Sequence, residues 1–460
     1  MLILGVLALS GCSQRFKSDT QDGRFVASPS VDCESVAEHY RDVVRRAGAV
    51  SAYGQVLPGA PWFRVLRGWA DWPIDSAEER RQWLQAAATL GEVAWRAELR
   101  NADQLELVPA MRRCAQRQVQ APVTDAQWQM LRQRAVVDSD YVRWQRLLGV
   151  YPLSRWGLRA GVRAWQQEFS SDYGPRPAQR DWEPWHPELT AGTAQQLLVQ
   201  APTLPGLARP SVTELEAWLR DFAPRLRLQI ESVDDWPGQP VWQDSLVFDV
   251  TQPRMHVQLL PGRDRGTPVW QLVFTVWFSG RAPASALDPY AGALDGIVWR
   301  VLLDGTGQVR VRDSIHPCGC YHMLFPPQAV RSAEGLDEPP LVPEVVAADG
   351  PVELLVRAVD HLIVDVRPVM PDTRGANALP LALYTELLAM PTPAGRTRSL
   401  FDATGLVTAS ARPERWYLWP SGVRSPGAMR IWGRHAIAFV GERHFDDPDL
   451  LERLLAEPSH

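Results

Sequence analysis

The hydrophobic pattern of the chain changes once, from a helical period to a strand period, across a segment dense in proline. Residues 32–171 repeat apolar side chains every three or four positions, whereas residues 211–460 carry short β-branched and aromatic runs bounded by Gly, Pro and Asp. Residues 172–210 hold too many prolines for a long helix or a central strand, so we expect a linker there. The pattern therefore predicts an α+β chain with a helical domain at 32–171 and a β-rich domain at 211–460.

The helical domain is expected to be an irregular bundle. The segments EERRQWLQAAATLGEVAWRAEL and TDAQWQMLRQRAV both place apolar residues at helical spacing. Thr124 or Asp125 stands where the second of them needs an N-cap.

The β-rich domain is expected to form a mostly antiparallel sheet with flanking helices. Residues 304–307, Asp-Gly-Thr-Gly, predict a hairpin between two apolar runs. On its second strand Val309, Val311 and Ile315 share a face that should pack inward, so His316 should emerge on the opposite, polar face. Further strands are expected in VELLVRAVDHLIVDV, RWYLWP and MRIWGRHAIAFVG.

The first residues, MLILGVLALSGCSQ, form an apolar run that ends in Leu-Ser-Gly-Cys. This stretch resembles the precursors of bacterial lipoproteins, and the resemblance covers only the signal peptide and lipobox. It implies a signal peptide at 1–11, a palmitate-bearing lipidation site at Cys12 and a tether at 12–31. Ser13 after the cysteine resembles the pattern that directs lipoproteins to the outer membrane, facing the periplasm.

Four cysteines remain for an oxidising compartment: Cys33, Cys114, Cys318 and Cys320. They allow three pairings. We favour a disulfide between Cys33 and Cys114, because both lie in the helical half, and this leaves Cys318 and Cys320 as a close pair.

Composition excludes several function classes. A formal net charge of −5 gives no basic excess for nucleic-acid binding. Lys17 is the only lysine of the chain, which excludes a pyridoxal Schiff base or a P-loop in the folded body. The 20 tryptophans are expected mainly in the core, although exposed ones could bind protein or glycan.

The segment SIHPCGCYHMLF, residues 314–325, is the strongest candidate site. Pro317 and Gly319 should bend the chain after the strand. A metal site would use His316 and His322 with Cys318, Cys320, or the distal His435 or His444, and would suit zinc, copper or iron. A redox site would use the two thiols, whose disulfide would be strained and easily reduced. A structural loop is the third possibility.

Other carboxylates near strand ends, among them Asp288, Asp295, Asp360 and Asp365, are expected to form turns, with His361 beside them. The sequence thus favours a lipid-anchored envelope protein whose His/Cys loop binds a ligand or transition metal. The alternatives are a metal-dependent or thiol-redox enzyme using this loop, and a non-catalytic scaffold that binds protein or glycan through tryptophans.

The anchor gives a first testable prediction. Cys12→Ala removes the sulfur that would be acylated, so incorporation of a clickable fatty acid should be lost and the protein should leave the membrane fraction. Unchanged labelling and fractionation of the variant would contradict the lipoprotein assignment.

Overall fold

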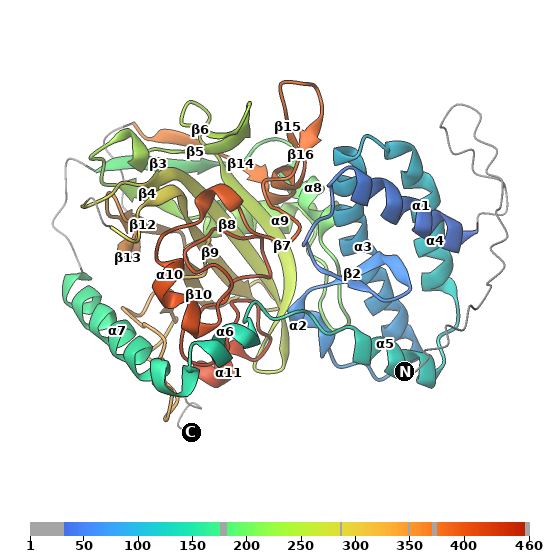
Figure 1. Ribbon diagram of the computed structural model, residues 1–460, viewed down its shortest axis with the longest axis horizontal. Helices are drawn as coiled ribbons and strands as arrows, with labels where there is room; N and C mark the ends of the chain where they lie inside the picture. The colour runs from blue at the N-terminus through green and yellow to red at the C-terminus, as the bar shows by residue number, and fades with distance from the viewer. Residues whose placement is uncertain (1–31, 175–181, 286–287, 348–349, 370–374, 456–460) are drawn as a thin grey trace, which may run out of the picture.

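The computed structural model describes residues 32–174, 182–285, 288–347, 350–369 and 375–455 (Figure 1). The expected signal peptide and tether, with Cys12, lie outside the described residues. Helices gather around the first part of the described chain, and a large mixed sheet forms most of the remainder. The α+β class is therefore confirmed.

The first hundred described residues pack helices around a small hairpin. The helices are α1 (Cys33–Arg46), α2 (Arg67–Ala70), α3 (Ala77–Asn101), α4 (Val108–Gln120) and α5 (Asp125–Arg134). The antiparallel strands β1 (Gln55–Leu57) and β2 (Ala60–Val65) lie among them, and the sequence pattern did not predict this hairpin. This part of the chain is therefore a helical bundle that also contains a β-hairpin.

Cys33 of α1 and Cys114 of α4 form a disulfide, with Cα atoms 5.6 Å apart, as the sequence predicted. The helix starts also follow local rules. Thr124 accepts a hydrogen bond from the Gln127 amide and caps α5, and Ser76 with Glu79 forms a capping box on α3. These contacts fix the ends of helices whose apolar faces build the core.

Helix α3 crosses β2 at Gly91. A Cβ atom at this position would lie 1.8 Å from the carbonyl oxygen of Trp62, so only glycine lets the two backbones approach this closely. Next to the crossing, Arg64 donates to Glu98 at 2.7 Å, and both side chains are buried. Helix and hairpin thus share one closely packed unit.

The central sheet runs in the order β11-β10-β9-β8-β7-β14-β3-β4-β12-β13. Neighbours pair antiparallel from β11 to β7, whereas β14 is parallel to both β7 and β3, and β12 is parallel to β4. The antiparallel prediction thus holds for only part of a mixed sheet. The bounds are β3 Glu183–Glu188, β4 Arg225–Leu228, β7 Met255–Asp264, β8 Thr267–Arg281, β9 Gly292–Leu303, β10 Val309–Ile315, β11 Met323–Phe325, β12 Val352–Val356, β13 Ile363–Pro368 and β14 Asn377–Leu383. A side ribbon, β5 (Pro237–Trp242) with β6 (Leu246–Asp249), joins β8.

Both faces of this sheet are buried. Along β8, Val273 and Trp277 belong to the core shared with the helical part, while Phe274 and Phe278 belong to a second core on the other face. The prediction that His316 follows a polar, exposed face is therefore wrong, because Arg312 and His316 are both buried. The alternation of apolar and polar residues along the strand could not show that other parts of the chain cover the face that carries Arg312 and His316.

The proline-dense segment is not a linker throughout. Its described part contributes strand β3, between β14 and β4, and helix α8 (Thr193–Gln200). Proline is tolerated because β3 is short and pairs with β4 through residues 183–185 and with β14 through residues 185–188. Helix α9 (Val212–Phe222) then leads into β4.

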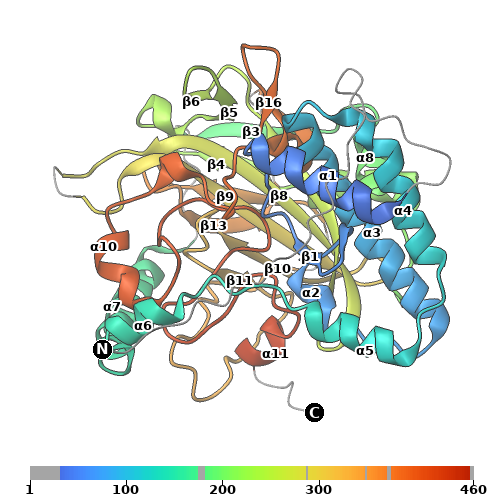
Figure 2. The same cartoon turned by 45° about the vertical axis from the view of Figure 1, so that its right-hand side comes forward.

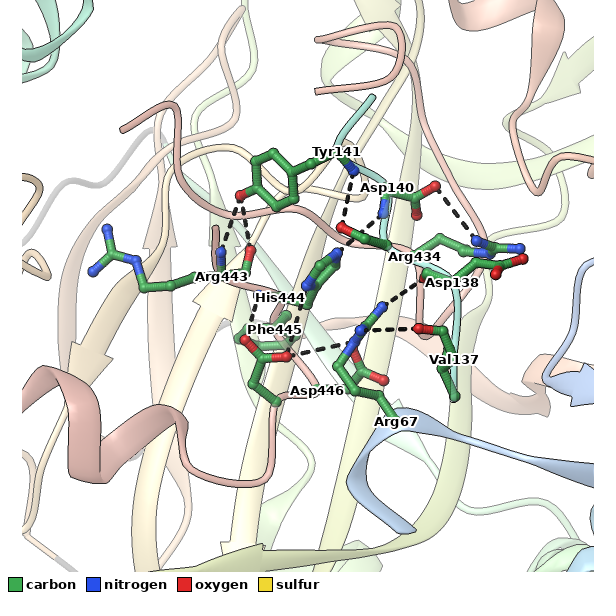
Figure 3. A network of polar contacts seen from close by, with 12 residues as sticks. Arg67, Val137, Asp138, Asp140, Tyr141, Arg434, Arg443, His444, Phe445 and Asp446 are labelled. Atoms are coloured by element: carbon green, nitrogen blue, oxygen red, sulfur yellow. Dashed lines mark hydrogen bonds and ion pairs between the residues drawn. The ribbon is translucent and has the colours of Figure 1, made fainter. Parts of the chain in front are cut away.

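Helices α6 (Arg143–Leu148) and α7 (Tyr151–Asp172) lie against the strand-rich part, on the far side from α1 and α3 (Figure 1). The chain reaches them through residues 137–142. Figure 3 shows Val137 and Asp138 beside Arg67 of α2, and Asp140 and Tyr141 bound to the C-terminal segment. The Tyr141 hydroxyl lies 2.8 Å from the carbonyl oxygen of Ala438 and 3.0 Å from that of Arg443, and it accepts hydrogen bonds from the amides of the same two residues. The amide of Asp140 donates to His444 Nε2 at 3.2 Å. This crossing joins the two halves.

The C-terminal segment departs most from its sequence pattern. Residues 415–418 form α10 (Arg415–Leu418) instead of a strand, and residues 428–440 make only isolated bridges. The closing helix is α11 (Leu450–Leu454). The aromatic residues that suggested strands here pack individually, as Trp432 does against His435 and Phe445.

Tryptophans mainly fill the interior, as predicted. Trp69, Trp83, Trp95, Trp270 and Trp299 are among the largest fully buried side chains. Trp144, Trp156 and Trp416 are strongly exposed and Trp236 is 37% exposed, so these four can contact a partner directly.

The α3–β2 crossing yields a stability prediction. Gly91→Ala should lower the free energy of unfolding by about 3 kcal/mol or more, because the added methyl group meets backbone atoms that cannot move independently. Gly157→Ala in α7 is the matched control, since a Cβ there meets nothing within 4 Å and should stabilise by about 0.5–1 kcal/mol. Urea titration followed by circular dichroism measures both, and equal effects would contradict the packing argument.

Candidate functional site

The His/Cys segment forms a tight loop directly after β10. The amide of Gly319 donates to the carbonyl of His316 at 2.8 Å, and the amide of His316 donates to the carbonyl of Cys320 at 3.0 Å. Gly319 has a φ of +90°, and a Cβ there would lie 2.4 Å from the carbonyl oxygen of Ala436. The loop is therefore held against the C-terminal segment in a shape that requires glycine.

Cys318 and Cys320 are both free thiols. The Cys320 amide donates to Cys318 Sγ at 3.3 Å, and the two thiols hydrogen-bond to one another. Cys318 is buried, whereas Cys320 is only partly buried. Cys320 is thus the more exposed residue of the two.

A chain of alternating carboxylates and imidazoles lies beside the thiols. His316 Nδ1 donates to Asp295 Oδ1 at 3.1 Å, and His361 Nδ1 donates to Asp295 Oδ2, also at 3.1 Å. His361 Nε2 lies 3.4 Å from Asp235 Oδ1. His361 also stacks on Phe278, with ring centroids 4.0 Å apart. All four charged or polar side chains are buried.

The topology of the sheet brings these residues together from distant parts of the chain. Asp295 lies on β9 and His316 follows β10, near one end of the strand order. His361 lies in the turn between β12 and β13, at the other end of that order. The sheet curls far enough for this turn to reach the start of β9 (Figure 2).

The backbone around these carboxylates and imidazoles is strained at several points. Leu294, Tyr321, Val359 and His361 are non-glycine residues with φ between 52° and 71°. Left-handed φ is especially costly for β-branched Val359, whose amide donates to Asp235 at 2.6 Å. Such strain persists only where surrounding contacts impose it, and it clusters at functional sites.

The charges of Asp295, His361 and their neighbours stabilise one another. Burial disfavours a charged His361, but its hydrogen bonds to Asp235 and Asp295 outweigh burial and raise its pKa to about 9. Burial likewise opposes ionisation of Asp295, yet Arg412 and the two imidazoles hold its pKa well below the usual range. Asp295 is thus a carboxylate and His361 an imidazolium at neutral pH.

The two thiols are electrostatically unequal. Burial disfavours the Cys318 thiolate, but the hydrogen bond from Cys320 and the positive charge of Arg412 lower the pKa of the Cys318 thiol. The same hydrogen bond, together with burial, raises the pKa of Cys320 well above its usual value. Arg412 is itself fixed, since its Nη2 donates to the carbonyl of Leu294 at 3.0 Å and lies 3.5 Å from Asp295.

Tyr321, Arg281 and Glu414 border the site. Arg281 donates to the Tyr321 hydroxyl at 3.3 Å, and Tyr321 packs against both His316 and Trp165 of α7. Burial raises the pKa of Glu414 to about 7, in spite of the nearby charges of Arg412 and Arg281. Glu414 can therefore hold or release a proton at neutral pH.

The histidines predicted as metal ligands have separate partners. His322 lies 3.4 Å from Asp313, which also forms a buried ion pair with Arg300. His444 accepts a hydrogen bond from the Asp140 amide (Figure 3), and burial lowers the pKa of His435 to about 3. Among the described residues no group of three or more His, Cys, Asp or Glu could hold a metal ion. The structure gives no support to zinc, copper or iron at His316, His322, Cys318, Cys320, His435 or His444.

Sequence reasoning found His316 and the thiols but assigned Asp295 and His361 to turns. A carboxylate inside the apolar run LDGIVW, and a histidine between LVRAVD and LIVDV, were the available signals. Asp235, Arg412 and Glu414 gave no signal, because their roles depend on contacts between distant segments. No family model, curated protein or solved structure matches the chain.

The charged state of His361 should appear in the pH dependence of stability. Its pKa is raised by folding, from an ordinary 6.5 to about 9, so its contribution is complete below about pH 6.5 and is lost as pH rises through 9. His361→Gln should therefore lower the free energy of unfolding most below pH 6.5, with a pH-dependent part on the order of 3 kcal/mol that disappears by about pH 9. Urea midpoints between pH 6 and pH 10 measure this, with His39→Gln on α1 as control. A difference between wild type and His361→Gln that does not change with pH would refute the assignment.

Proposed function

We propose that this protein is a thiol–disulfide oxidoreductase whose redox centre is Cys318 and Cys320. The observation that carries the proposal is the pair of free, mutually hydrogen-bonded thiols of unequal pKa beside Arg412 and the Asp295–His316 pair. A dithiol needs one sulfur that leaves readily as a thiolate and a second that is accessible. Cys318 has the first property, and Cys320, the more exposed residue of the two, would be the sulfur that a substrate attacks.

The unequal thiols favour a particular direction of electron flow. Stabilising the thiolate of Cys318 stabilises the reduced form, which makes the corresponding disulfide a stronger oxidant. A disulfide between residues separated only by Gly319 would also depart from relaxed geometry, which favours its reduction. The protein would therefore oxidise substrate dithiols.

The reaction can be written so that electrons and protons balance. A substrate thiol gives its proton to His316, and its sulfur attacks Cys320 Sγ of the disulfide form. The bond between Cys320 and Cys318 breaks, and Cys318 leaves as a thiolate. A second substrate thiolate then attacks the first substrate sulfur and releases Cys320, which takes the proton from His316. The substrate loses two electrons and two protons; the protein gains two electrons and one proton, and one proton enters solvent.

His316 is suited to the proton transfer. Its Nδ1 hydrogen is held by Asp295, which leaves Nε2 as the basic nitrogen. Nε2 is buried and has no hydrogen-bond partner among the described residues. This orientation by a carboxylate is the arrangement that general bases use in nucleophilic catalysis.

The proposal includes the location inferred from the lipobox. A lipid anchor at Cys12 would hold the protein in the outer membrane, facing the periplasm, where dithiol oxidation is chemically useful. The disulfide between Cys33 and Cys114 supports an oxidising compartment.

The redox test is equilibration with glutathione buffers, acid quenching, alkylation and mass spectrometry of the peptide that contains residues 314–325. We expect a Cys318–Cys320 disulfide with a potential near or above about −200 mV, and oxidation of a model dithiol peptide. Cys318→Ser and Cys320→Ser should each abolish this oxidation, and His316→Gln should slow it by about 10²–10⁴-fold. His322→Gln, on the same loop but paired with Asp313, should not. Failure of the two thiols to pair at any glutathione ratio would refute the proposal.

A second function, cysteine-dependent acyl transfer, is favoured by the Asp295–His316 pair, which could also serve a nucleophilic Cys318. Cys320→Ser separates the two functions. It should abolish dithiol oxidation, whereas an acyl transferase would retain labelling of Cys318 by an acylating probe.

A further inference from the structure

An exposed apolar surface runs along helices α6 and α7. Its large side chains have exposed fractions between 53% and 78%. They are Trp144, Leu147, Leu148, Val150, Leu153 and Trp156. We call these six residues the α6–α7 face. Soluble surfaces rarely gather so many large apolar side chains within a few turns of helix.

Helix α7 is apolar on both of its sides. Its inner side carries Trp165 and Phe169, which contact Tyr321 and Tyr173. Its outer side continues from Leu153 and Trp156 through small exposed residues, Gly157, Ala160 and Ala164, at spacings of three and four. The outer side of a helix that faces only water is normally polar, so the apolar outer side of α7 indicates a contact surface.

The α6–α7 face is bordered by arginines, one of which, Arg146, pairs with Glu442. Residues 143–167 contain five arginines and no aspartate or glutamate, in a chain whose net charge is −5. Arg143 and Arg163 are exposed beside the face, and Arg155 and Arg159 bind Asp337 from the strand-rich part. Tryptophan and leucine flanked by arginine are the composition of helices that lie in the interface of an anionic membrane.

We propose that the α6–α7 face inserts into the surface of a bilayer that contains anionic phospholipid. Leu147, Leu148 and Leu153 would enter the acyl region, the tryptophans would lie at the headgroups, and Arg143 and Arg163 would pair with phosphates. No helix among the described residues is long and apolar enough to cross a membrane. In the proposed contact, α7 lies in the plane of the membrane surface. The proposal depends neither on acylation of Cys12 nor on the redox function.

This contact would also orient the molecule. Trp165 on the inner side of α7 touches Tyr321, which packs on His316. Both views place α7 at the edge of the strand-rich part (Figures 1 and 2). A bilayer against the outer side of α7 would hold the thiol loop one helix away from the membrane surface.

The test uses the full chain with Cys12, Cys318 and Cys320 replaced by serine and an environment-sensitive fluorophore on Leu153→Cys. With vesicles of phosphatidylcholine and phosphatidylglycerol, the emission should shift to the blue and strengthen several-fold, and salt should reverse it. The same label on Val199→Cys in α8, a residue 66% exposed, is the matched control and should not change. Arg143→Glu with Arg163→Glu should raise the lipid concentration at half-saturation by on the order of tenfold or more.

A second measurement needs no fluorophore and so does not depend on correct folding of the variant with three cysteines replaced by serine. Arg143→Glu with Arg163→Glu in the otherwise wild-type chain should float with the anionic vesicles less than the wild-type chain does. Both chains carry the same N-terminal run, so its contribution to membrane binding cancels in this comparison. No spectral change at position 153, or an equal change at positions 153 and 199, would overturn the proposal. A blue shift that grows with protein concentration without lipid would overturn it in favour of a second copy covering the face.

Discussion

The structure around the thiols depends on one buried carboxylate, that of Asp295. An unpaired carboxylate in the interior would cost several kcal/mol, so it must be matched by charges that are themselves held in place. His361 and Arg412 supply positive charge and His316 donates a hydrogen bond, and these partners come from the β12–β13 turn, the C-terminal segment and the end of β10. Asp295 therefore connects the β12–β13 turn and the C-terminal segment to strands β9 and β10, which already pair directly. The strained φ values of Leu294 and His361 can be maintained because these contacts oppose local relaxation.

The helical layer gives this site its surroundings. Trp165 of α7 packs against Tyr321, which in turn packs against His316, so this helix helps to enclose the site. Enclosure strengthens the electrostatic inequality of the thiols, since a low dielectric magnifies both burial and charge. The same helix carries its unusual apolar surface outward, so one element of 22 residues serves both the site and the proposed membrane contact.

The sequence pattern correctly predicted the features that depend on interactions between residues close in sequence. The helices of the first half and the cap at Thr124 followed from residue spacing, and the pairing of Cys33 with Cys114 from the position of both cysteines in the helical half. The turn at residues 304–307 connects β9 with β10, as its Asp-Gly chemistry indicated. The pattern failed where tertiary contact overrides propensity: residues 415–418 are helical despite their aromatic content, and β3 forms within a proline-dense segment. The His361–Asp295 contact could not be inferred, because it requires the curl of the whole sheet.

The charge pattern of the site links its redox state to protons. Cys318 and Glu414 interact unfavourably when both are charged, and Glu414 has a pKa of about 7. Forming the Cys318–Cys320 disulfide would remove the thiolate charge but leave Arg412 and Arg281 in place. The remaining positive charges would then favour ionisation of Glu414 and lower its pKa, so oxidation would release a proton from this carboxyl. Reduction would reverse the change. By linkage, the redox potential of the pair should then depend on pH around neutrality through a group that takes no part in sulfur chemistry.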